Sequence, residues 1–166
     1  MKQYFVEMLR YNIWANSKYR EYFAEINFGD LSFKTPYGTF YDMILHLYKP
    51  HLMWLNRIDN SIKFREDQDH ENWESLCKSW INHENIFLDF LNMREEKIFE
   101  KTIDYTFNNK KYTRKIKNII NHMIVHPIHH RGQISSLLRV HNFPAAPQTD
   151  MVFYYLDINV DKITLT

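Results

Sequence analysis

Apolar residues recur at three- and four-residue spacing in four long stretches of this 166-residue chain. The stretches are residues 3–26, a second that opens at Thr39 and continues through Leu55, residues 73–93 and residues 115–141. This spacing puts the apolar side chains on one face of a helix. Only three glycines occur, which suits helices better than a fold of many tight turns. Four helices that must each bury one face predict an all-α four-helix bundle.

Short motifs set the expected helix boundaries. Gly29 can end the first helix, and Thr39 followed by Asp42 has the spacing of a capping box that opens the second. Pro50 is expected to bend that second helix. The charged stretch 63–72 is expected to be an exposed loop.

Residues 98–115 change from a helical to a strand pattern. Ile103, Tyr105 and Phe107 alternate with polar residues and precede the pair Asn108–Asn109, which tolerates the positive φ of a tight turn. The sequence therefore predicts a small β-hairpin between the third and fourth helices. A short helix is expected over DMVFYYL, residues 150–156, and residues 1–166 are expected to form a single domain.

Composition excludes several classes of function. Lysine and arginine number 21 against 20 acidic residues, so no electrostatic case exists for nucleic acid or a membrane surface. The basic run KKYTRKIK at 110–117 is interpreted as solvated surface. Cys77 is the single cysteine, so neither an internal disulfide nor a thiolate zinc knuckle can form. Without an apolar span or a leader pattern, the expected location is cytoplasmic.

The stretch HPIHHRGQ, residues 126–133, carries the candidate chemistry. His126 and His130 lie one helical turn apart on the same inward face as Met123, so both imidazoles can bind one metal ion. Core histidines with ordinary hydrogen bonds are the competing interpretation. A third ligand is expected from a facing helix. His46 is the candidate, on the apolar stripe of the second helix between Leu45 and Leu47.

The remaining histidines are expected to stand apart from such a site. His122 falls at the margin of the inward face and His129 points away from it. The others have more polar surroundings or lie near helix ends: His51, His70, His83 and His141. Pro127 removes the amide that would bond to the carbonyl of Met123, and the resulting kink either aims His126 or is a packing feature without chemistry.

The chain resembles the DinB family of damage-inducible bundles. The resemblance rests on HHRGQ at 129–133 with His126 before it, on Trp14-Ala15-Asn16 in the first helix, on His46 followed by Trp54, and on QTDMVFYYL near the end. It implies a four-helix bundle with a divalent ion held by His46, His126 and His130. Two positions depart from the family's usual pattern, Val125 before the first ligand of the pair and Pro127 after it.

Three neutral imidazoles suit zinc or nickel best, with iron, manganese and copper left open. Three protein ligands leave a coordination position open, as catalytic sites require. Some relatives of this family, similar in fold and ion site, use a low-molecular-weight thiol such as bacillithiol or mycothiol. The resemblance therefore implies transfer of a thiol to a small electrophilic substrate through an ion-bound thiolate, with no general base assigned. The alternatives are a hydrolase using an ion-bound hydroxide and a non-catalytic metal-binding stress protein.

A homodimer is a further expectation, based on the aromatic share of 16% and on Tyr154 and Tyr155 near the C-terminus. These aromatic residues can cover a face in a dimer. They can equally belong to an ordinary core, and the sequence leaves both interpretations open.

Overall fold

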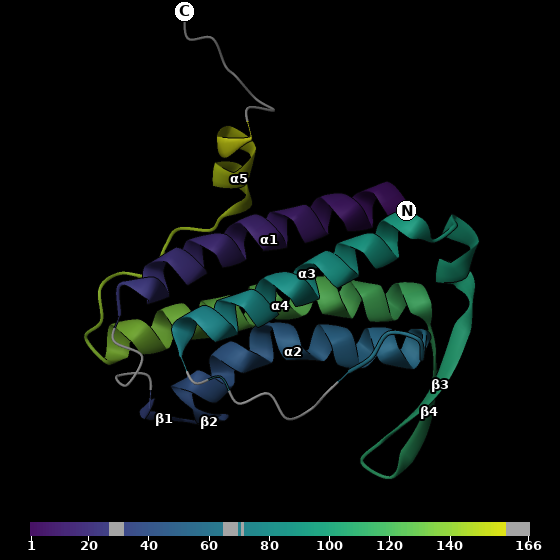
Figure 1. Ribbon diagram of the computed structural model, residues 1–166, viewed down its shortest axis with the longest axis horizontal. Helices are drawn as coiled ribbons and strands as arrows, with labels where there is room; N and C mark the ends of the chain where they lie inside the picture. Colours follow the sequence, from purple (N-terminus) through teal and green to yellow (C-terminus); the bar gives the residue numbers. More distant parts are fainter. Residues whose placement is uncertain (27–31, 65–69, 71, 159–166) are drawn as a thin grey trace, which may run out of the picture.

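The computed structural model describes residues 1–26, 32–64, 70 and 72–158. Four long helices lie side by side along its length (Figure 1). The described chain is mostly helical, which confirms the predicted all-α class. In chain order the elements are α1 (Lys2–Ala24), β1 (Lys34–Thr35), β2 (Gly38–Thr39), α2 (Phe40–Ile58), α3 (Trp73–Met93), a 3-10 helix η2 (Glu96–Glu100), β3 (Thr102–Phe107), β4 (Lys110–Lys115), α4 (Ile116–Val140) and α5 (Met151–Asp157).

The boundaries of the helices follow from local chemistry. The Thr39 hydroxyl accepts the Asp42 amide at 3.1 Å, and the Asp42 carboxylate accepts the Thr39 amide at 2.7 Å, which confirms the predicted capping box. α1 ends at Ala24, slightly before the predicted end. The proposed stop at Gly29 and most of the predicted loop at 63–72 lie outside the described residues.

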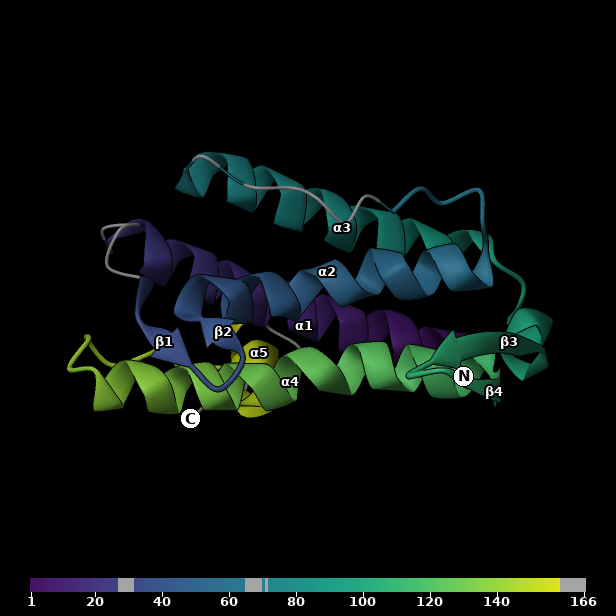
Figure 2. The same ribbon diagram turned by 90° about the horizontal axis from the view of Figure 1, so that it is seen from below.

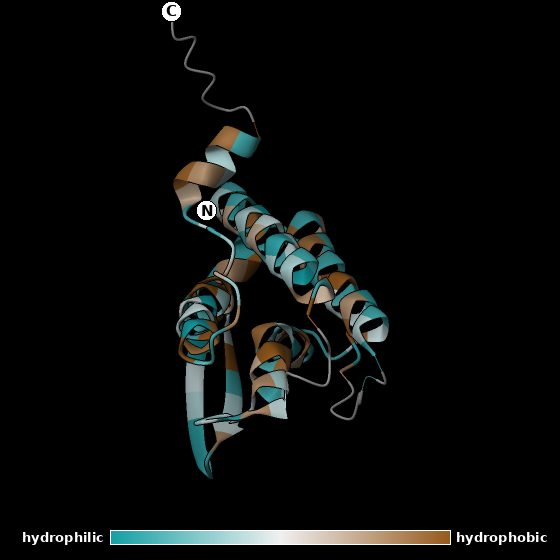
Figure 3. Cartoon of the chain, turned by 90° about the vertical axis from the view of Figure 1, so that its left-hand side faces the viewer, coloured by the Kyte–Doolittle hydropathy of each residue, from teal (hydrophilic) through white to brown (hydrophobic). Residues whose placement is uncertain are grey.

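Each long helix packs against two others. α1 contacts α3 and α4, and α2 contacts the same two helices. Figure 3 views the helices nearly along their axes and shows hydrophobic and hydrophilic residues on each of them. The buried side chains form two main groups along this length, one around Phe87 and Ile120 and the other around Trp80 and Leu138.

Two antiparallel hairpins lie at opposite ends of the paired helices α2 and α4 (Figure 2). β1 pairs with β2 just before α2 begins. β3 pairs with β4 through a turn at Asn108 and Asn109, whose φ angles of 48° and 59° lie in the left-handed region that asparagine tolerates. Most side chains of β3 and β4 are exposed, so this hairpin adds little to the core.

The short helix α5 packs on α1. The Tyr154 ring lies 5.7 Å from the Tyr11 ring and 5.6 Å from the Trp14 ring, and Tyr154 is buried. Its aromatic surface is thus covered from within the chain, as the core interpretation expects. Among the described residues, no helix combines the length and hydropathy that crossing a bilayer requires.

Candidate metal centre

The three histidines singled out by the sequence converge between α2 and α4. The Nε2 atom of His126 lies 3.0 Å from Nε2 of His46 and 3.1 Å from Nε2 of His130. One ligand atom from each residue lies within 4.8 Å of the other two, a grouping that could hold a metal ion. The helical spacing puts His126 and His130 on one side of α4, and the packing of α2 on α4 brings His46 to them.

Hydrogen bonds between the three imidazoles do not by themselves account for the short distances between their Nε2 atoms. The Nδ1–H of His130 donates to Oε1 of Gln133 at 2.7 Å, so its Nε2 carries a lone pair. Nε2 of His126 faces two other Nε2 atoms yet can carry only one proton. Nitrogens bound tetrahedrally to zinc at about 2.0 to 2.1 Å would be separated by roughly 3.4 Å. The donor set and its spacing therefore fit a divalent cation.

All three imidazoles are held in their neutral form. Partial burial of the rings is the main cause that lowers the pKa of each below its ordinary value, and neighbouring histidines add to it. For His126 these effects lower the pKa to about 3. A neutral imidazole has the lone pair that a metal ligand needs, so the cluster is ready to bind an ion at neutral pH.

Two residues outside the predicted set orient this cluster. Gln133 accepts from His130 and donates through Nε2 to the hydroxyl of Tyr37 at 3.1 Å. Tyr37, in the turn between β1 and β2, stacks on His46 with ring centroids 6.4 Å apart and meets the His130 ring edge-on at 5.7 Å. Such contacts fix the tautomer and angle of a ligating ring. Gln133 stands three residues after His130 in the noted motif, whereas no sequence signal pointed to Tyr37.

Around Pro127 the structure shows two side-chain hydrogen bonds that the sequence does not predict. Pro127 has no amide to donate to the Met123 carbonyl, and Nε2–H of His51 donates to that oxygen instead, at 3.1 Å. Asn12 similarly donates to the Ile124 carbonyl at 2.8 Å. Side chains from α2 and α1 thus donate hydrogen bonds to the backbone carbonyls of α4 that precede the proline.

The expectation of polar surroundings for His51 and His83 is wrong. His51 is 1% exposed and His83 is 6% exposed, because the His51 ring packs on Phe87 of α3 and bonds to Met123 of α4, while the His83 ring packs on Tyr48 of α2. Burial is the main cause that lowers the pKa of each of these rings to about 4. The expectation for His46 also needs correction. It lies beside the apolar stripe and is exposed, while Leu45 and Leu47 are buried.

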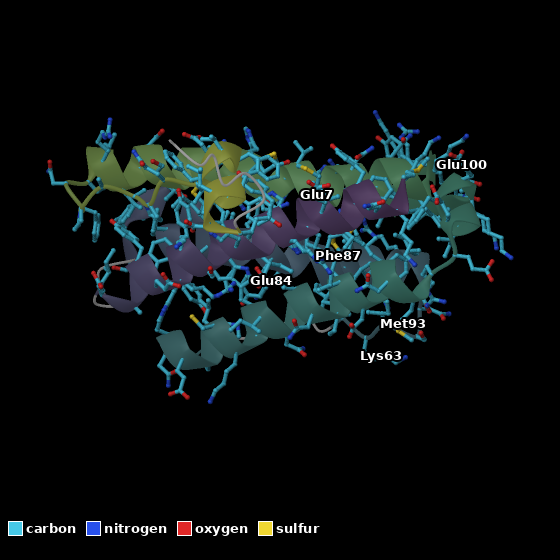
Figure 4. All side chains as sticks on the ribbon, turned by 90° about the horizontal axis from the view of Figure 1, so that it is seen from above. Glu7, Lys63, Glu84, Phe87, Met93 and Glu100 are labelled. Carbon is cyan, nitrogen blue, oxygen red and sulfur yellow. The ribbon has the colours of Figure 1, made fainter. Side chains whose placement is uncertain are left out.

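A buried polar network anchors α4 on the side facing α1. The guanidinium of Arg131 donates to Oδ1 of Asn16 and to Oδ1 of Asn12, both at 2.9 Å. Asn16 donates in turn to Glu84 at 2.8 Å, and Arg20 pairs with the same carboxylate at 3.0 Å. Figure 4 labels Glu84 between α1 and α3. Arg131 directly follows His130 in α4. The network therefore constrains the rotation of α4 about its axis, and with it the direction of the His130 side chain.

Sequence reasoning missed the function of this network. The available signal was the placement of Asn12 and Asn16, which share the apolar stripe of α1 with Leu9. Two amides on a buried face require partners. In the sequence, Arg131, which satisfies them, stands out only as part of the HHRGQ motif.

A cavity of about 660 Å³ opens beside the histidine cluster, between α2, α4 and the β3–β4 hairpin. His46 and His126 line it, and so does His122, whose ring lies 5.2 Å from that of His126. His129 is exposed, as predicted for a residue off the inward face. The cluster therefore faces a space large enough for a small molecule.

The comparison with known families agrees with the resemblance seen in the sequence. The model of the DinB family matches residues 1–154. No curated protein gives a significant match to the chain.

Proposed function

This chain belongs to the DinB family, and from that membership we propose that it is a metal-dependent enzyme that transfers a low-molecular-weight thiol to a small electrophilic substrate. In this proposal its four long helices are the family's four-helix bundle. The observation that carries the proposal is the convergence of three Nε2 atoms beside a cavity of about 660 Å³, which two of the three residues, His46 and His126, line. Cavities of this size accommodate small organic molecules.

His46, His126 and His130 would hold the ion, with zinc or nickel preferred for an all-imidazole site and iron, manganese or copper as alternatives. An ion with an open position would lower the pKa of a thiol that binds there. Gln133 keeps Nδ1 of His130 protonated and thereby leaves its Nε2 free to ligate. The cavity walls hold the reacting molecules against His46 and His126.

The proposed reaction is a substitution at carbon. The thiol sulfur loses its proton to solvent and forms a bond to the electrophilic carbon, and the leaving group departs with the electron pair of the bond that breaks. The mostly apolar cavity wall, which includes Met53, Trp54 and Ile119, supports an organic nucleophile over water. If water is the nucleophile, the same three histidines would serve a hydrolase.

The first experiment measures metal content by elemental analysis of untagged protein. We expect near-stoichiometric metal in wild type and in His129→Ala, whose ring lies outside the cluster. The variants His46→Ala and His130→Ala should lose it. Absence of metal from wild type, even after incubation with zinc and nickel, would overturn the proposal.

The second experiment measures the reaction. Metal-loaded protein is mixed with a panel of low-molecular-weight thiols and monobromobimane, and fluorescence reports the new carbon–sulfur bond. We expect acceleration over the uncatalysed reaction, which is lost in His46→Ala and retained in His129→Ala. Turnover of ester or amide substrates without any thiol would favour the hydrolase. If the metal-loaded protein is inactive in both assays, the remaining interpretation is a non-catalytic metal-binding stress protein.

A further inference from the structure

The cavity beside the histidines contains two arginines and no acidic residue. Arg57 of α2 and Arg114 of β4 line it, and neither forms an ion pair within the described part of the chain. Arg57 is half-buried. An unpaired guanidinium in a partly apolar cavity attracts an anion more strongly than one in open water.

Both guanidinium groups lie over aromatic rings. Arg57 lies 4.5 Å from the Trp54 ring centroid and 5.5 Å from that of Tyr105. Arg114 lies 5.5 Å from the Tyr112 ring, and Tyr105 stacks on Tyr112 at 5.5 Å. One N–H of Arg114 donates to the Thr113 carbonyl at 2.9 Å, and a guanidinium held over a ring keeps its other in-plane N–H groups available for a planar anion such as a carboxylate.

The arginines and the histidines lie toward different ends of the cavity. His46 and Arg57 are eleven residues apart on α2, which corresponds to about 16 Å along a helix axis. Trp54 lies between them in sequence, with its ring 6.0 Å from that of His122. A molecule that reaches from one end to the other must be elongated, with an apolar middle part.

We propose that the cavity selects an elongated organic anion, with an apolar body against Trp54 and a carboxylate or similar group bound by Arg57 and Arg114. Its opposite end then reaches His46 and His126. This inference names the reactant class of the site and in that respect rests on the proposed function. Binding of the anion itself requires neither an ion at the histidines nor turnover.

The test compares 6-phenylhexanoate with its neutral analogue 6-phenylhexanamide by isothermal titration calorimetry. The full-length chain is used both as purified and after treatment with a chelator, because a carboxylate could otherwise bind an ion at the histidines. We expect the carboxylate to bind about tenfold more tightly than the amide in both preparations. The preference should weaken as salt is added.

Three variants locate the binding site. Arg57→Gln and Arg114→Gln should each reduce the preference for the carboxylate, while Lys111→Gln should retain it. Lys111 belongs to the same hairpin but lies outside this cavity. Arg114 is exposed, so its substitution leaves the folded core intact.

Equal binding of carboxylate and amide, or no binding of either, would overturn the inference. A preference that survives both arginine substitutions would overturn it as well. If wild type holds no metal but retains an arginine-dependent preference, the proposed function fails while anion binding stands. If metal is present but the preference is absent, only the anion inference fails.

Discussion

The Nε2–H of His51 donates to the carbonyl oxygen of Met123 at the position where Pro127 removes the helical donor. A proline inside a helix costs roughly 3 kcal/mol, partly through that lost bond. Here an imidazole from the neighbouring helix α2 satisfies the oxygen. The segment that carries His126 and His130 is thus stabilised by a histidine that lies outside the predicted ligand set.

The pairing of His51 with Pro127 predicts a non-additive mutational result. In wild type, His51→Phe should destabilise the fold by about 1 to 3 kcal/mol, because the Met123 carbonyl is left unsatisfied. In a Pro127→Ala background the main-chain amide returns, so His51→Phe should cost clearly less. Urea unfolding of chelator-treated protein measures both costs, and equal values in the two backgrounds would refute the pairing.

Gln133 is predicted to control metal affinity without being a ligand. Gln133→Leu removes the acceptor for His130 Nδ1–H and the donor to Tyr37, so the imidazole loses its fixed tautomer. We expect metal affinity to fall by about 10- to 100-fold. Competition against a chromophoric chelator measures it. The control is Ser136→Ala, on the same helix, whose hydroxyl bonds only to the Gly132 carbonyl among the described contacts.

Acid should weaken the metal-free fold through His83. Its folded pKa of about 4 lies below the ordinary 6.5, so the unfolded chain binds more protons between these values. The free energy of unfolding therefore falls as pH falls through this window, by up to about 1.4 kcal/mol per pH unit from this group.

The variant His83→Gln isolates this contribution. Tyr48, Lys49 and His70 face the ring and remain in both proteins. The difference in unfolding free energy between the two proteins, measured in urea after chelator treatment, should change with pH between 6.5 and 4 and level off above. A pH-independent difference would contradict a buried neutral His83.

Arg131 is predicted to be the most sensitive residue of the polar network. Arg131→Met leaves the side-chain carbonyl oxygens of Asn12 and Asn16 buried without donors and should cost about 1 to 3 kcal/mol for each oxygen. Arg131→Lys should not restore stability, because one ammonium cannot reproduce the two-pronged contact. The exposed Arg139→Met should change stability by about 0.5 kcal/mol or less, so urea midpoints separate the cases.

Local periodicity and motifs predicted much of this architecture, because helices are largely specified by near neighbours in sequence. The capping box at Thr39 and the left-handed turn at Asn108 and Asn109 are examples. The grouping of His46 with His126 and His130 came from a wheel argument and a family resemblance, and the three side chains do meet. Their role as metal ligands stays a prediction.

Contacts between distant segments escaped sequence reasoning for a physical reason. Whether His51 is buried depends on how α2 packs against α3 and α4, which its own neighbours in sequence do not encode. The partners of Arg131 lie more than a hundred residues away, on α1. Tyr37 reaches the histidines only because a short hairpin folds back toward α2 and α4.

The hairpin β3–β4 supplies one wall of the cavity while contributing few buried side chains. Replacing its cavity-facing residues should therefore cost little folding stability, since surface substitutions are usually nearly neutral. The histidines and the Arg131 network lie on the long helices, where substitutions are expected to reduce folding stability more strongly. Within the proposed function, the choice of bound molecule can therefore change through substitutions in this hairpin while the three histidines stay unchanged.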